Sequence, residues 1–284
     1  MTAYMEHKDL ANETIDKARA DEIAGNVHAV LDRVAAAEES AGRKAGSVRL
    51  LAATKTRDVG EIMAAIDAGI RMIGENRPQE VQVKAPGLLR LAAERGFVLG
   101  TGGDGQNGQN DGDATNATNG ANGTIPFHLI GQLQSNKIGK ILPFVDTIES
   151  VDSIELAEKI ARRAVTRGIT VGVLLEVNES GEASKSGCPA SHAIDLAQRI
   201  GNMGGLELQG LMTIGAHVSD EATIRAGFAH LRKTRDQILA SGAPGTEHCT
   251  ELSMGMTGDM DLAIAEGATI VRVGTGIFGE RAFI

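Results

Sequence analysis

Lys55 is the residue of this sequence whose type and position most plainly allow covalent chemistry. It ends a predicted strand, RLLAATK (49–55), in which side chains alternate between two faces, so Ala53 and Lys55 share one face. If that face is the inside of a barrel, the amine lies among small apolar neighbours. Burial there disfavours the ammonium and leaves a neutral nucleophile that can attack a carbonyl. The alternative is a surface lysine that precedes a turn.

Two segments rich in glycine and hydroxyl residues have the composition of phosphate-binding loops. One is SMGMT (253–257) and the other is GTG (274–276), and each directly follows or ends a predicted strand. Glycine lets backbone N–H groups approach phosphate oxygens, and small hydroxyls and the start of a following helix add further attraction for the anion. The segments therefore predict a phosphate site, although such glycines can also serve only to form tight turns.

A reactive lysine opposite a phosphate site indicates a phosphorylated aldehyde. That describes pyridoxal phosphate, and equally the sugar-phosphate substrate of an aldolase. Arg272 bears on the choice, because in IVRVGT it shares a face with Ile270 and Gly274 and would point inward. There it can donate to a pyridine nitrogen without giving up its own proton, which leaves the ring a poor electron sink. The alternative for Arg272 is an ion pair with a carboxylate inside the barrel.

Other polar residues at predicted strand ends give weaker signals. Asn76 can flank a cofactor ring, whereas His128 lies on an apolar strand and is expected to be a core histidine. His217 and His248 have no partners at spacings typical of metal ligands, so the sequence predicts no metal site.

Eight short strand-like runs alternate with amphipathic helical segments and would position these residues. The runs are 49–55, 71–76, 127–132, 146–150, 171–178, 208–214, 250–255 and 269–275. A further helix is expected at 27–41, and Asp58 with Glu61 resembles a capping box. This is the strand count of an α/β protein with a (β/α)8 TIM barrel, whose active site lies at the C-terminal ends of the strands. An open doubly wound sheet is the alternative, but no GxGxxG follows the first strand.

Composition limits the class of protein. The 284 residues carry a formal charge of −9, which does not favour a nucleic-acid or anionic-membrane partner. The charged N-terminal segment lacks the apolar stretch of a signal peptide, and no apolar run approaches the roughly 18 residues that span a bilayer. The two cysteines fit neither a disulfide framework nor a CxxC motif. We expect a cytoplasmic protein that is a monomer or a weak dimer.

The chain divides into a short tail and one domain. Residues 1–25 are expected to form an N-terminal tail with the start of a helix, and residues 26–284 the barrel domain. Within it, 100–124 is rich in Gly, Asn and Asp and contains no Lys or Arg. Such a segment cannot bury enough apolar surface to become ordered, so we expect a disordered insertion.

Seven segments resemble, in order and spacing, those of the pyridoxal phosphate homeostasis protein family. They are AATKTRDVGEI, IGENRPQE, FHLIGQLQSNKIGKI, ESVDS, EVNESGEASKSG, LQGLMTI and ELSMGMTGDMDLAIAEGATIVRVGTGIFGER. The resemblance covers about residues 27–281 apart from the insertion. It implies a fold-type III barrel related to the N-terminal domain of alanine racemase, with pyridoxal phosphate as the cofactor.

The resemblance also implies roles for individual residues. The implied cofactor-binding set is Lys55 as the Schiff-base lysine, Asn76 near the ring, Arg272 at the pyridine nitrogen, and Ser253, Gly255, Gly274 and Thr275 around the phosphate. Lys185, in SKSG, corresponds to a lysine that helps cofactor transfer. No catalytic residues are implied. The resemblance implies a carrier that buffers and delivers pyridoxal phosphate in vitamin B6 homeostasis, with apo-enzymes as recipients. Glu149 stands where the family commonly has His.

Two enzymatic functions remain as alternatives. A racemase of the alanine racemase type needs a tyrosine from a second domain opposite the lysine, and the sole tyrosine here is Tyr4, in the tail. The sequence given ends soon after the last predicted strand, so we expect no such domain. An aldolase would need a carboxylate base on a neighbouring strand, for which Glu75 and Glu176 are candidates.

Overall fold

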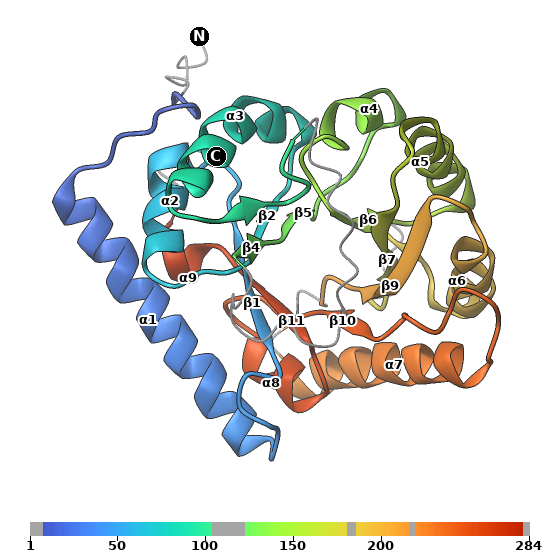
Figure 1. The fold of residues 1–284 in the computed structure, drawn as a ribbon. Helices are drawn as coiled ribbons and strands as arrows, with labels where there is room; N and C mark the ends of the chain where they lie inside the picture. Colours follow the sequence, from blue (N-terminus) through green and yellow to red (C-terminus); the bar gives the residue numbers. More distant parts are fainter. Residues whose placement is uncertain (1–7, 104–122, 181–185, 216–217, 219, 281–284) are drawn as a thin grey trace, which may run out of the picture.

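A closed barrel of eight parallel strands forms the centre of the molecule (Figure 1). The computed structural model describes residues 8–103, 123–180, 186–215, 218 and 220–280. The barrel strands are β1 Arg49–Ala53, β2 Ile73–Glu75, β5 Phe127–Leu129, β6 Thr147–Val151, β7 Val171–Asn178, β9 Leu206–Met212, β10 Glu251–Ser253 and β11 Ile270–Val273. Their spatial order is β6-β5-β2-β1-β11-β10-β9-β7, and pairing of β6 with β7 closes the ring. The predicted TIM barrel is confirmed over the doubly wound sheet.

Helices surround the barrel on its outer side (Figure 1). In the part of the chain that the structure describes they are α1 Lys17–Ser40, α2 Val59–Asp67, α3 Pro78–Glu94, α4 Ile138–Ile141, α5 Ile154–Arg167, α6 Ala193–Gly201, α7 Glu221–Ala240, α8 Met260–Ala265 and α9 Thr275–Phe278, with 3-10 turns η2 Ser135–Lys137 and η3 Ala190–His192. None of these helices is both long and apolar enough to cross a bilayer.

Two local predictions about helix starts have different outcomes. The capping box of α2 is confirmed, because Asp58 accepts from the Glu61 backbone N–H at 2.9 Å and Glu61 from that of Asp58 at 3.4 Å. The helix expected at 27–41 instead begins at Lys17, where Asp16 caps it by accepting from the Arg19 N–H at 2.9 Å. The added turns are mostly polar, and they are held by burial of Ile23 and by the hydrogen bonds of Arg19 to Glu61 and to Phe278 O.

The barrel has an inner cluster and an outer core. Leu51, Met72, Ile130 and Ile270 form a small separate cluster with Ala53 packed against it. The outer core lies between the strands and the helices, and it includes Ala52. Ala53 therefore faces the barrel interior, as the alternation along the first strand predicts.

Short strands flank the segment predicted to be a disordered insertion. β3 Val98–Leu99 pairs with β4 Thr124–Ile125, and Gly100 N–H donates to Ile125 O at 2.9 Å. Thr124, within the predicted insertion (100–124), is therefore part of a strand, because ladder hydrogen bonds hold it. The greater part of the insertion, residues 104–122, lies outside the described residues. A further short strand, β8 Cys188–Pro189, pairs with β7.

Candidate functional site

Lys55 lies just beyond the C-terminal end of β1, at the mouth of the barrel. Thr54 N–H still donates to Gly74 O of β2 at 2.9 Å, so the chain leaves the sheet at Lys55 itself. The Lys55 side chain is half-buried, so its removal from water is partial. The next residue, Thr56, has φ of 66°, and it is the one non-glycine residue with positive φ in the described part of the chain. A β-branched residue in this region is strained, so the surroundings must hold the turn in place.

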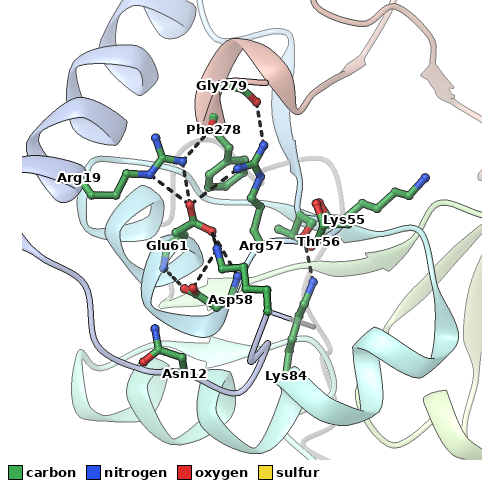
Figure 2. A network of polar contacts seen from close by, with 12 residues as sticks. Asn12, Arg19, Lys55, Thr56, Arg57, Asp58, Glu61, Lys84, Phe278 and Gly279 are labelled. Atoms are coloured by element: carbon green, nitrogen blue, oxygen red, sulfur yellow. Dashed lines mark hydrogen bonds and ion pairs between the residues drawn. The ribbon is translucent and has the colours of Figure 1, made fainter. Parts of the chain in front are cut away.

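The residues after Lys55 are tied to the far end of the chain (Figure 2). Arg57 donates to Gly279 O at 2.7 Å, and Arg19 donates to Phe278 O and to Glu61 Oε1, both at 2.7 Å. Burial opposes ionisation of Glu61, but the charges and hydrogen bonds of Lys8, Arg19 and Arg57 lower its pKa below its ordinary value. In Figure 2 the Lys55 side chain extends away from this network.

Strand order brings together the predicted cofactor-binding residues that the structure describes. β2, β1, β11 and β10 are consecutive in the barrel. Asn76 follows β2, Lys55 follows β1 and Gly274 follows β11, whereas the 253–257 loop begins at the last residue of β10. Ala53 pairs with Gly74 of β2. On its other side, a Cβ added to Gly274 would lie 3.3 Å from Ala53 O. The lysine and both glycine-rich loops therefore meet at one sector of the barrel mouth.

The two predicted phosphate loops contact each other. The hydroxyl oxygens of Thr257 and Thr275 are 3.2 Å apart, and Gly276 N–H donates to Thr257 Oγ1 at 3.3 Å. Gly255 has φ of 91°, and a Cβ there would lie 2.5 Å from Ala263 Cβ. Only glycine suits that position, since the conformation is left-handed and the space is filled. The sequence-based set did not include Thr257, and its place in the same hydroxyl-rich motif was the available signal.

Arg272 and Ser253 point into the barrel and are bonded to each other. Arg272 Nη1 donates to Ser253 Oγ at 2.7 Å, and Nη2 donates to Thr213 O at 2.8 Å. Ser253 Oγ donates in turn to Glu149 Oε2 at 2.5 Å, and Glu149 Oε1 lies 2.7 Å from His128 Nδ1. All these residues are buried. The inward Arg272 and the buried His128 both agree with the sequence-based expectations.

Burial and pairing have opposite effects on the pKa values of the charged residues in this interior network. Burial raises the pKa of Glu149, but His128, Arg272 and Ser253 together lower it below its ordinary value. Burial also lowers the pKa of the Arg272 guanidinium, although the carboxylates of Glu149, Glu176 and Asp259 oppose that change. Arg272 Nη1 lies 4.0 Å from Glu149 Oε2, so the guanidinium has a carboxylate beside it as well as donors left for a ligand.

The residues at this sector fit a phosphorylated pyridine aldehyde. A half-buried amine, two glycine-rich loops joined through hydroxyls and a fixed guanidinium lie on consecutive strands. The left-handed φ of Gly255 is typical of the backbone concavities that bind anions, whereas the closed space at its Cβ position results from packing against Ala263. The Ser253 hydroxyl, by contrast, is already engaged on both sides within the barrel.

The structure separates the two carboxylates proposed as aldolase bases. Glu75 is fully buried and accepts from Lys84 Nζ at 2.6 Å and from Asn76 N–H at 2.7 Å. Glu176 is buried on β7, where burial and the nearby Asp152 charge raise its pKa to about 7 despite the opposing Arg272.

Lys84 was not predicted from the sequence, because a Glu–Lys pair four residues apart on a helix ordinarily lies at the surface.

Two features lie apart from the site. Lys185 is outside the described residues, and its neighbour Ser186 accepts from Gln132 Nε2 at 2.7 Å. A surface hollow of about 500 Å³ lies along η2, α4 and α5, where Asn136, Lys159 and Arg163 line it. None of the predicted cofactor-binding residues lines that hollow. No cluster of potential metal ligands occurs among the described residues.

Comparison with known proteins connects the chain to one family over most of its length. The family described as alanine racemase, N-terminal domain, matches residues 26–282. The pyridoxal phosphate homeostasis protein of Vibrio cholerae is 35% identical over 261 residues, covering 92% of this chain and 97% of the relative. The protein of the same name from Escherichia coli K12 is 32% identical, covering 93% and 98%.

Solved structures agree with this result. An unknown protein from Bifidobacterium adolescentis is 73% identical with a TM-score of 0.87, covering 95% of this chain and all of the other. PipY of Synechococcus elongatus with PLP bound is 30% identical with a TM-score of 0.69, covering 90% of this chain and all of PipY. An alanine racemase of Clostridium difficile, at 12% identity and a TM-score of 0.64, shares the fold, and this chain covers 61% of it. The chain belongs to the pyridoxal phosphate homeostasis protein family, built on the barrel of the alanine racemase N-terminal domain.

Proposed function

We propose that this protein binds pyridoxal phosphate as a Schiff base on Lys55, buffers it in the cytoplasm and delivers it to apo-enzymes. The bound cofactor supplies an aldehyde carbon that forms a C=N bond to the Lys55 amine, with release of one water. The observation that carries the proposal is the adjacency of β2, β1, β11 and β10, which gathers an amine and two phosphate-type loops. PipY, which is 30% identical, has PLP bound in its solved structure.

The residues of the chain have distinct roles in this proposal. Gly255, Gly274 and Thr275 hold the phosphate, together with Thr257, whose hydroxyl lies beside that of Thr275. Arg272 donates to the pyridine nitrogen. Asn76 lies beside the ring.

We propose a different role for Ser253 from the one implied by the resemblance. Because its hydroxyl is engaged by Glu149 and Arg272, we assign it to orienting Arg272 rather than to a direct phosphate contact through its side chain. Lys185 is proposed to assist transfer of the cofactor.

A carrier function is supported over racemisation. An arginine at the pyridine nitrogen keeps its own proton, so the ring stays a poor electron sink for carbanion chemistry. The relatives at 32–35% identity are named homeostasis proteins, whereas the alanine racemase at 12% identity shares only the fold. An aldolase function has no support from Glu75, whose carboxylate is held by Lys84 and the Asn76 N–H.

Delivery and turnover can be separated in one experiment. The loaded protein is mixed with the apo form of a pyridoxal phosphate enzyme, and recovery of that enzyme's activity is followed beside a parallel assay of amino-acid racemisation. We expect activity to be restored, with racemisation no faster than with free cofactor. Lys185→Ala should slow the transfer while leaving cofactor affinity unchanged. Racemisation that depends on Lys55 would contradict the carrier assignment.

A further inference from the structure

A buried cluster of three charged residues lies directly beneath the turn that carries Lys55. It consists of Lys84 on α3, Glu80 one turn earlier on the same helix, and Glu75 on β2, and we call it the ion triad. Lys84 is fully buried, and its Nζ donates to Glu75 Oε2 at 2.6 Å, to Glu80 Oε2 at 2.7 Å and to Thr54 O at 2.9 Å. All three donors of the ammonium are therefore used.

The ion triad holds the backbone on both sides of Lys55. Before it, Thr54 O accepts from Lys84 and Thr54 Oγ1 donates to Glu75 Oε2 at 2.9 Å. After it, Thr56 N–H donates to Glu80 Oε2 at 2.8 Å. Figure 2 shows Lys84 reaching the turn from below. Thr56 is the residue with the strained positive φ. Its hydrogen bond to the buried Glu80 carboxylate therefore stabilises a backbone conformation that Thr56 would otherwise not keep.

The same cluster fixes the neighbouring loop that carries Asn76. Glu75 Oε1 accepts from the Asn76 N–H at 2.7 Å and from the Arg77 N–H at 3.2 Å. The two carboxylate oxygens of Glu75 thus connect the strand end of Asn76 to that of Lys55. Gly131 packs against the same loop, since a Cβ there would lie 2.2 Å from Asn76 O.

We propose that Lys84, through the ion triad, is the positioning residue that sets the backbone direction from which the Lys55 amine reaches its carbonyl partner. The inference rests on the proposed function for the identity of that partner. A buried ion cluster is often replaceable by apolar residues without loss of stability, so stability alone does not account for it. Its hydrogen bonds instead converge on the two residues that flank Lys55. When the triad is removed, Thr56 relaxes toward negative φ and the Lys55 side chain changes direction.

The test compares variants of the ion triad with a packing control. Glu80→Leu with Lys84→Met removes one positive and one negative charge. It breaks the contacts to Thr54 O and to the Thr56 N–H, and leaves only that of Thr54 Oγ1 to Glu75. Glu80→Gln keeps an acceptor for the Thr56 N–H and serves as the conservative variant. Leu88→Ala, fully buried on the same helix, is the matched control for a loss of packing away from the turn. Circular dichroism and thermal midpoints establish which variants fold.

The first readout separates positioning from binding. Formation of the Schiff-base absorbance band with pyridoxal phosphate should slow about tenfold or more in the double variant, as expected for a misplaced reacting group. Affinity for pyridoxine phosphate, which lacks the aldehyde, should stay within about twofold. Glu80→Gln should keep most of the Schiff-base rate of the unmodified protein. Leu88→Ala should form the Schiff base at the same rate as the unmodified protein. If the double variant does not fold, Glu80→Leu alone is compared with Glu80→Gln: a slower rate in Glu80→Leu supports the role of the triad, and equal rates overturn it.

The second readout needs no cofactor. Acylation of Lys55 by a small reagent, mapped by mass spectrometry in cofactor-free protein, should also fall in the double variant. Equal acylation and equal Schiff-base rates in folded variants would overturn the role of Lys84. If the unmodified protein forms no Schiff base, the proposed function fails, and the acylation contrast still decides whether the triad positions Lys55.

Discussion

The Arg272 guanidinium donates a hydrogen bond of 2.7 Å to the Ser253 hydroxyl, so two residues expected to contact the cofactor contact each other. They belong to adjacent strands, and Glu149 from across the barrel accepts from the same hydroxyl at 2.5 Å. The barrel interior beneath the site is therefore a chain of polar groups in which each member fixes the next.

Removal of Glu149 should destabilise the protein strongly. Glu149→Ala leaves Arg272 buried without its nearest carboxylate and breaks the contact to His128, and losing one partner of a buried pair costs about 3–5 kcal/mol. The free energy of unfolding is measured with urea. Glu158→Ala, at an exposed position on α5, is the control and should stay within about 0.5 kcal/mol. A loss below about 1 kcal/mol for Glu149→Ala would show that the network does not hold Arg272.

Glu176 should make stability fall as the pH rises from about 4.5 to about 7. Burial and Asp152 raise its pKa from 4.5 to about 7, so the folded state holds the proton more tightly than the unfolded state does. Burial of Glu176 therefore does not lower the free energy of unfolding below the unfolded pKa, and it lowers that free energy by its full amount above the folded pKa. Glu176→Gln should raise the free energy of unfolding by about 3 kcal/mol near pH 8, since one pKa unit corresponds to about 1.4 kcal/mol.

The pH dependence provides the check on that prediction. Near pH 4.5 the gain from Glu176→Gln should shrink to about 0.5 kcal/mol or less. Glu158→Gln, with an exposed carboxylate, should show no such change between the two pH values. An equal effect of Glu176→Gln at both values would mean that the carboxyl ionises normally in the folded protein.

Gly255 should be needed both for folding and for the phosphate. Gly255→Ala places a side chain at φ of 91° and 2.5 Å from Ala263 Cβ, and strain of this kind costs about 1–3 kcal/mol. The loop must shift to relieve it, so affinity for pyridoxine phosphate should fall about tenfold, or about 1.4 kcal/mol. Gly258 in the same loop has open space around its Cβ position, so Gly258→Ala is the matched control for calorimetric titration. Unchanged affinity in Gly255→Ala would remove this loop from the phosphate site.

Local patterns predicted the parts of the site that depend on one strand at a time. Alternation along β1 and β11 correctly turned Ala53 and Arg272 inward, because side-chain direction in a strand is set by the strand's own period. The capping box of α2 is likewise a contact between residues three apart. The eight strands were predicted in the same way, because each is a short local run of strand-forming residues.

Contacts between distant segments could not be predicted in this way. Lys84 looks like a surface residue of an amphipathic helix, and only the approach of Thr54 and Glu75 shows that it is buried. The commitment of Ser253 to Glu149 joins residues 104 apart in sequence and depends on closure of the barrel. The early start of α1 depends on burial of Ile23 in a segment that is otherwise polar.

Reduction of the cofactor-loaded protein with borohydride, followed by peptide mapping, tests the assignment of Lys55 as the Schiff-base lysine. We expect one pyridoxyl-labelled residue, Lys55, and loss of both the label and the Schiff-base absorbance in Lys55→Ala. Ligand binding should also stabilise the unmodified protein by about 2.7 kcal/mol at a hundredfold excess over Kd. A label on another lysine, or none, would contradict the assignment of Lys55.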